Sequence, residues 1–183
     1  MTLEKMIELA KKIKDEKLRE KTIEILKDIK LTHPSFSKYP REDPEKVKTP
    51  FIVNDIISIR ELTNHTVAVT KACLELAKVI EENYGIKVNH DVLIAGSLLH
   101  DIMKVYEFKD GQHTGILLDH SALGLAELYK RDFPEEVLHL IISHPAPSTN
   151  PPKTIEAIIL HYADTLMALI EFSTSQQLIK GEE

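Results

Sequence analysis

The sequence is poor in the residues that build disulfide-linked or β-rich proteins. Its 183 residues include no tryptophan, one cysteine and six glycines. The single cysteine, Cys73, allows no intramolecular disulfide and excludes a disulfide-dense scaffold. So few glycines argue against an all-β fold with many tight turns. The core must therefore consist mainly of Leu, Ile, Val and Ala.

Long apolar segments are also missing. No run approaches the roughly 20 apolar residues that a membrane span needs. The N-terminal stretch MTLEKMIELAKKIKDEK is charged throughout and lacks the apolar centre of a signal peptide. We therefore expect a cytoplasmic protein with no membrane partner.

The charge is divided unevenly along the chain. Residues 1–50 hold 13 basic and 10 acidic side chains, a balance of +3, whereas the remainder holds 10 basic and 19 acidic ones, a balance of −9. An acidic main body is not typical of a general polyanion binder. Such a body can still accept a phosphate through divalent cations that it concentrates.

Apolar residues recur at helical spacing along most of the chain, which predicts an all-α fold of about seven or eight helices. Two short helices, or one kinked helix, are expected before His33. Residues 33–50 contain four prolines and predict an irregular connector. We expect residues 1–50 to pack on a main domain of residues 51–183, so that the whole chain forms one structural domain.

Helix ends are marked by residues typical of caps. Gly85 predicts the end of the helix that begins near residue 63. The predicted helix starts carry these residues: Thr63 or Asn64, Asn89, Asp119, Pro134 and Thr154. The segment 105–118 contains Asp110-Gly111 and predicts a small hairpin or loop.

The stretch SLLHDIMK, residues 97–104, ends an apolar helix with His100 and Asp101. Burying such groups is costly unless they are compensated, and a metal ion is one way to compensate them. Similar residues lie at the ends or on the apolar faces of other predicted helices. The full set is His65, His100, Asp101, His120, His144 and Asp164. Histidines and carboxylates that converge from several helices are how helical bundles form metal sites.

The order His … His-Asp … His … His … Asp resembles the HD superfamily of metal-dependent phosphohydrolases over roughly residues 60–172. It is most similar to the HD domain of the 3′-5′ exoribonuclease-like branch. The similar stretches are HTVAVTKACLELA, LLHDIMKVYEF, HTGILLDHSALG, HLIISHPAP and EAIILHYADTL. The resemblance implies an HD-type helical bundle.

The resemblance also implies roles for individual residues. A first metal would be held by His65, His100, Asp101 and Asp164, and a second by Asp101, His120 and His144. Asp101 would bridge the two metals and Lys104 would bind a phosphate oxygen, which makes these two the expected catalytic residues. The ligand types suit one or two ions of Mn, Fe, Co, Ni or Zn, with Mg as a further candidate.

Some neighbouring residues bear on the site without being expected ligands. Arg60 and Glu61 either line the pocket or form an exposed ion pair, and His161 is expected to support Asp164. Three positions depart from the family pattern. Met103 and Asp119 stand where glycine is usual, and Pro145 stands where a histidine is frequent.

We expect metal-dependent hydrolysis of a phosphoester in a nucleotide or short oligonucleotide, in the manner of an exoribonuclease or phosphodiesterase, with water as the nucleophile. Three alternatives stay open: a nucleoside 5′-monophosphate phosphatase, a di-iron oxygenase of the same fold, and a non-catalytic metal-containing nucleotide or RNA binder. The expected partner is a phosphorylated small molecule or a short single-stranded nucleic acid. The uneven charge is also compatible with a homo-oligomer.

Overall fold

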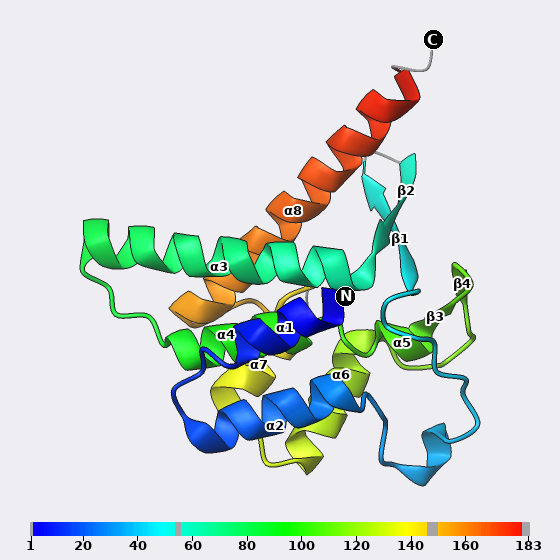
Figure 1. Ribbon diagram of the computed structural model, residues 1–183, viewed down its shortest axis with the longest axis horizontal. Helices are drawn as coiled ribbons and strands as arrows, with labels where there is room; N and C mark the ends of the chain where they lie inside the picture. The colour runs from blue at the N-terminus through cyan, green and yellow to red at the C-terminus, as the bar shows by residue number, and fades with distance from the viewer. Residues whose placement is uncertain (1, 54–55, 146–149, 181–183) are drawn as a thin grey trace.

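The computed structural model describes residues 2–53, 56–145 and 150–180, with side chains described as far as residue 175. The helices in these ranges are α1 (Thr2–Ala10), α2 (Glu16–Lys27), α3 (Leu62–Tyr84), α4 (His90–Leu99), α5 (Lys104–Glu107), α6 (His120–Lys130), α7 (Glu135–Ser143), α8 (Ile155–Lys180) and the short 3-10 helix η1 (Pro34–Phe36). The strands are β1 (Lys48–Val53), β2 (Ile56–Glu61), β3 (Phe108–Lys109) and β4 (Gln112–His113). The predicted all-α class with about seven or eight helices is confirmed (Figure 1).

Capping residues determine where most of the helices begin and end. Three predicted N-caps are confirmed by a side-chain oxygen that accepts a backbone N–H: Asn89, Asp119 and Thr154. Pro134 is the N-cap residue of α7, as predicted. Gly85 ends α3 with a φ of 65°, a left-handed conformation that glycine adopts without steric cost.

The predicted cap of α3 is wrong. The helix begins one or two residues earlier than Thr63 or Asn64, with Glu61 as its N-cap and no side-chain cap hydrogen bond. Strand β2 runs directly into α3, and Leu62 is 1% exposed. Burial of Leu62 and pairing of β2 therefore fix this helix start in place of a capping side chain.

Helix α4 is the central element of the bundle. Every residue from Val92 to Asp101 is buried, and α4 contacts α1, α2, α3, α7 and α8. Gly96 allows the close approach of α7, because a Cβ at this position would lie 2.4 Å from Cδ2 of Leu140. The C-terminal end of α4 thus carries His100 and Asp101 into the middle of the protein.

The hairpin of β1 and β2 is a feature that the sequence analysis did not anticipate. The strands pair antiparallel from Lys48↔Glu61 to Val53↔Ile56. In Figure 1 the hairpin runs beside the C-terminal half of α8, which extends away from the other helices. The two contact each other through the Oγ atoms of Ser58 and Ser175, 3.1 Å apart. The division expected between residues 50 and 51 falls inside β1, so this hairpin joins the two predicted segments.

The second hairpin was predicted. Strands β3 and β4 pair antiparallel on either side of Asp110 and Gly111, which have φ values of 50° and 75°. Positive φ at both central residues is typical of tight hairpin turns. This hairpin lies between the end of α5 and the start of α6, so it links two elements that carry site residues.

Within the described ranges, no helix is both long and apolar enough to span a membrane.

Candidate metal centre

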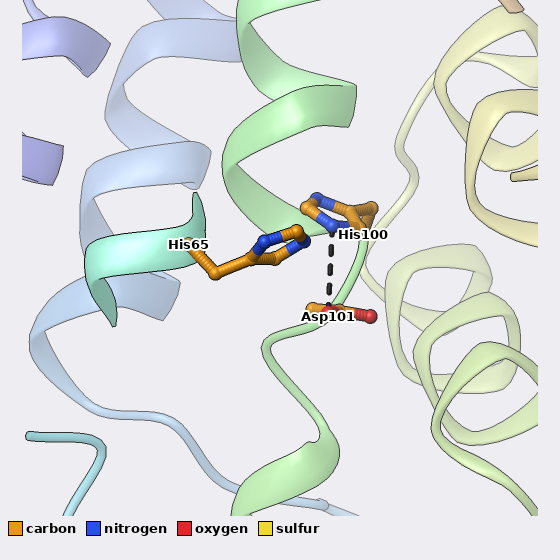
Figure 2. A group of neighbouring side chains, drawn as sticks. All are labelled: His65, His100 and Asp101. Carbon is orange, nitrogen blue, oxygen red and sulfur yellow. Dashed lines mark ion pairs between the residues drawn. The ribbon is translucent and has the colours of Figure 1, made fainter. Parts of the chain in front are cut away.

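Three of the predicted ligands meet where the start of α3 faces the end of α4 (Figure 2). His65 lies in the first turn of α3, and its ring is directed toward His100 and Asp101. His100 is the C-cap residue of α4, and its Nε2 lies 3.5 Å from Oδ2 of Asp101. All three side chains are at most 1% exposed. The helix ends therefore bring three polar groups together inside the core.

The other three predicted ligands approach from α6, α7 and α8. His120 is the first residue of α6 and His144 follows the last residue of α7. Their Nε2 atoms lie 3.3 Å and 3.4 Å from Oδ1 of Asp101. Asp164, on α8, places Oδ1 2.8 Å from Nε2 of His65. The six residues, which come from five separate segments of the chain, thus form one cluster around Asp101.

Three overlapping sets of donors within the cluster have atoms that all lie within 4.8 Å of one another: His65, His100 and Asp101; His100, His144 and Asp164; and Asp101, His120 and His144. The first set holds three of the four ligands expected for the first metal, without Asp164, and the third set holds the three expected for the second. The second set links them, because His144 lies close to ligands expected for the first metal. The three sets therefore overlap through His100, Asp101 and His144.

Backbone carbonyls orient two of the histidines. Nδ1 of His100 donates to the carbonyl of Ser97 at 2.7 Å, and Nδ1 of His144 donates to the carbonyl of Ile141 at 2.7 Å. A carbonyl only accepts hydrogen bonds, so the proton of each neutral ring is on Nδ1. The lone pair of each Nε2 is left facing the cluster, which is the orientation that a metal ligand requires.

Carboxylates orient the other two histidines. Nδ1 of His120 lies 2.8 Å from Oε2 of Glu107, and Nδ1 of His65 lies 3.0 Å from Oε2 of Glu171. Carboxylate–histidine pairs of this kind fix ring orientation and strengthen metal ligands. The sequence analysis missed both glutamates. Glu171 follows Asp164 by seven residues, on the same face of α8, which is the one signal that could have identified it.

Two atoms at the centre of the cluster lack a partner among the described residues. Nε2 of His100 and Oδ1 of Asp101 are buried, and neither forms a hydrogen bond. Most buried polar atoms are hydrogen-bonded, so each exception calls for an explanation. One nitrogen and one carboxylate oxygen facing the same cluster fit a divalent transition metal.

The pKa shifts of Asp101, His100 and His120 suit the same role, whereas that of His65 has the opposite direction. Burial lowers the pKa of His100 to about 3, and burial together with the charge of Lys104 lowers the pKa of His120. Burial alone would raise the pKa of Asp101, but the charge of Lys104 and the nearby histidines hold it well below its ordinary value. For His65, hydrogen bonds to Asp164 and a second carboxylate outweigh burial and raise the pKa. Asp101 is thus an anion, and His100 and His120 are neutral near pH 7.

Two cations also lie against the cluster. Nζ of Lys104 is 2.7 Å from Oδ2 of Asp101, and Lys104 is 9% exposed. Nη2 of Arg60 is 3.3 Å from the same oxygen, and its side chain is 8% exposed. Of the two interpretations left open for Arg60, the structure supports the one in which it lines the site. Glu61 is exposed and accepts a hydrogen bond from Asn64.

Two further expectations have different outcomes. His161 was expected to support Asp164, but its Nδ1 donates to the carbonyl of His144 at 3.0 Å, so it braces the end of α7 instead. Asp119, which stands where the family usually has glycine, uses its carboxylate to cap α6 through Ser121 and Ala122. The carboxylate of Asp119 therefore stabilises the start of α6, next to His120.

Comparison with known proteins gives a family for this arrangement. The family model of the HD domain matches residues 62–169, which include all six clustered residues. The chain is 44% identical to dihydroneopterin 2′,3′-cyclic phosphate phosphodiesterase of Methanocaldococcus jannaschii, over 88% of this chain and 67% of that protein. It is 40% identical to the 3′-5′ exoribonuclease YhaM of Bacillus subtilis, over 52% of this chain and 35% of that protein. No solved structure is significantly similar to the chain.

Proposed function

The chain belongs to the HD domain family, and from that premise we propose that it cleaves a small cyclic phosphodiester. It is a metal-dependent phosphohydrolase, as the family and the 44% identical phosphodiesterase indicate. The choice of a cyclic phosphodiester is supported by the extent of the two similarities, because the phosphodiesterase matches 88% of the chain and the exoribonuclease 52%.

The observation that carries the proposal is that six candidate ligand residues gather in one cluster, where two central atoms have no hydrogen-bond partner among the described residues. We assign a first metal to His65, His100, Asp101 and Asp164, and a second to Asp101, His120 and His144. When bound, two such cations would neutralise phosphate oxygens and activate a water molecule as the nucleophile.

Imidazole and carboxylate donors suit several ions. HD domains bind divalent metals, and the clustered residues can hold them. Neutral imidazoles favour Mn²⁺, Fe²⁺, Co²⁺, Ni²⁺ or Zn²⁺ over Mg²⁺, which prefers oxygen ligands. We propose a transition metal of this group and no single member of it.

The side chains around the metals have separate tasks in this proposal. Glu107 and Glu171 hold the rings of His120 and His65 in their binding orientation. Lys104 is a buried cation next to Asp101, so it can hold an oxygen of the phosphate or balance charge on the oxygen that leaves. Hydrolysis adds water at phosphorus, breaks one ester bond of the ring and leaves a phosphate monoester.

The test measures whether the protein, supplied with Mn²⁺, hydrolyses three substrates. They are a 2′,3′-cyclic phosphate, a nucleoside 5′-monophosphate and a short single-stranded RNA. Asp101→Asn controls for contaminating activity. Opening of the cyclic phosphate that is absent in the control supports the proposal. Release of inorganic phosphate from the 5′-monophosphate alone would contradict it and favour the phosphatase.

A second candidate is an exoribonuclease, supported by the 40% identity to the Bacillus enzyme. Shortening of the RNA without ring opening would select it. Oxygen uptake by the iron-loaded protein would instead favour the oxygenase, and metal binding without turnover of any ester would favour the binder.

The expected cytoplasmic location and the expected homo-oligomer stay predictions. Light scattering of the metal-loaded protein measures the second directly.

A further inference from the structure

Arg60 is a buried cation that the proposed chemistry has not yet used. It lies on β2, and its guanidinium faces two carboxylates of the cluster and the carboxylate of Glu171. Nη2 is 3.3 Å from Oδ2 of Asp101 and 3.9 Å from Oδ1 of Asp164, and Nη1 is 3.8 Å from Oε2 of Glu171. Only the first of these distances is a hydrogen bond, and it is a long one.

The guanidinium of Arg60 has N–H donors that are not all paired with the described residues. Arginine carries five N–H donors, and the Nε of Arg60 is buried with no hydrogen-bond partner among the described residues. Leaving donors of a buried charged group unfilled is costly. A side chain that is 8% exposed and incompletely paired is therefore suited to receive an acceptor that the protein itself does not provide.

The hairpin supports this placement. Arg60 pairs across the strands with Thr49, whose Oγ1 is also buried and finds no hydrogen-bond partner in the part of the chain that the structure describes. The guanidinium carbon lies 5.1 Å from the centre of the Phe51 ring on the same hairpin, a cation–π distance that restrains the side chain. Because directly paired residues share one face of a hairpin, the two unpartnered atoms, Nε of Arg60 and Oγ1 of Thr49, lie on the same side of it.

The charges point to an anion. Four carboxylates lie in or against the cluster, those of Asp101 and Asp164 and of the orienting Glu107 and Glu171, and two divalent cations would neutralise them. The buried positive charges of Arg60 and Lys104 would then remain. A phosphodiester carries the negative charge that they lack, and the planar guanidinium fork matches two phosphate oxygens.

We propose that Arg60 is a substrate-binding residue whose guanidinium binds the non-bridging oxygens of the phosphodiester. The proposal rests on the function proposed above and adds the residue that recognises the phosphate. The rival role is structural: Arg60 would only neutralise the ligand carboxylates and hold Asp101 in place.

The two roles differ in what happens when the charge is removed. If Arg60 binds phosphate, Arg60→Gln keeps two metals per chain, with equal or tighter metal affinity because a nearby positive charge is gone. Its affinity for inorganic phosphate falls about 10- to 100-fold, as expected for lost charge-assisted hydrogen bonds. Arg60→Lys keeps the charge but not the fork, and should lie between Arg60→Gln and the wild type.

The measurement is calorimetric titration of inorganic phosphate into Mn²⁺-loaded protein, with metal content and melting temperature determined on the same samples. Arg131→Gln is the matched control. Arg131 is a mostly buried arginine outside the cluster, paired with Glu127 at 2.7 Å, so its loss should leave phosphate affinity unchanged.

Unchanged phosphate affinity in Arg60→Gln, with lost metal or a lower melting temperature, would overturn the assignment in favour of the structural role. If Arg60→Gln does not fold, Arg60→Lys decides the question by the same titration. A wild type that cleaves the cyclic diester while Arg60→Lys and Arg60→Gln bind phosphate normally refutes the role of Arg60 alone. A wild type that neither binds phosphate nor cleaves any diester refutes the proposed function as well.

Discussion

The two ends of α4 differ in how completely their polar groups are hydrogen-bonded. At the start, Asn89 caps the helix, and its own N–H donates to Glu156 at 2.7 Å. The carboxylate of Asp91 accepts the backbone N–H groups of Lys14 and Asp15, both at 2.9 Å. Each of these groups has a partner within the protein, and the two hydrogen bonds to Asp91 fix the loop between α1 and α2 against the helix.

At the other end, His100 and Asp101 are more deeply buried yet less completely paired. Nε2 of His100 and Oδ1 of Asp101 form no hydrogen bond with the described residues. In the proposed function, the same helix thus uses polar residues for folding at its start and for metal binding at its end. Changes at the start should lower stability, whereas changes at the end should remove metal and activity.

The largest expected effect is at the end of the helix. Asp101→Asn keeps the shape of the side chain but loses the negative charge that we propose to bind the metals. We expect the rate of hydrolysis to fall by about 10³-fold or more, with loss of bound metal. The matched change at the start, Asp91→Asn, should keep the metal and the rate. Equal losses of activity in the two variants would contradict the proposed difference between the two ends of α4.

The next effect concerns the glutamates that orient the histidines. Glu107→Gln and Glu171→Gln should each lower metal affinity or activity about 10- to 100-fold, because a neutral amide orients the imidazole less well. Metal titration and steady-state kinetics measure this. Glu127 is the control: it is 3% exposed and hydrogen-bonds Arg131 and Thr32, away from the cluster. Glu127→Gln should lower the melting temperature without changing metal affinity, and the opposite result would contradict the assignment.

Substitutions in the apolar middle of α4 should lower the stability of the fold. In Gly96→Ala the new methyl group would lie 2.9 Å from Cβ of Leu140, so α7 must move. Overpacking of this kind costs about 1–3 kcal/mol, which lowers Tm by about 2–4 °C per kcal/mol for a chain of this size. A double-mutant cycle with Leu140→Ala should show favourable coupling, since the smaller residue makes room. Additive effects would show that the two residues do not press on each other.

The smallest effect is a pH dependence just before the start of α4. Hydrogen bonds from His90 and from the N–H of Val88 lower the pKa of Glu81 below its ordinary value of 4.5. Because the folded pKa is lowered, the stabilisation is fully present above pH 4.5 and is lost as pH falls through the folded value. Thermal melts of the metal-free protein between pH 3 and pH 6 should show a shallower pH dependence in Glu81→Gln. An identical dependence in both proteins would refute this contribution.

The contrast between the ends of α4 also explains what the sequence could predict. The helix starts at Asn89, Asp119 and Thr154 depend on local hydrogen bonding, so the capping residue alone is enough to predict each of them. The turn at Asp110-Gly111 is equally local. The six clustered residues could be selected because a charged or polar group on a buried face is unusual wherever it occurs.

What the sequence could not predict depends on contacts between distant segments. Glu107 and Glu171 support the cluster only because α5 and α8 bring them beside His120 and His65. Arg60 was ambiguous because its burial depends on the hairpin of β1 and β2, which the sequence analysis did not anticipate. Residue type alone does not distinguish these side chains from exposed ones, since acidic and basic residues make up 28% of the chain.

The most direct test of the central claim is the metal content per chain, measured by inductively coupled plasma mass spectrometry after loading and desalting. The proposed centre predicts close to two ions in the wild type, close to one in His120→Ala, and close to none in Asp101→Asn. Equal metal content in the wild type and Asp101→Asn would contradict it, because the ions would then be bound elsewhere.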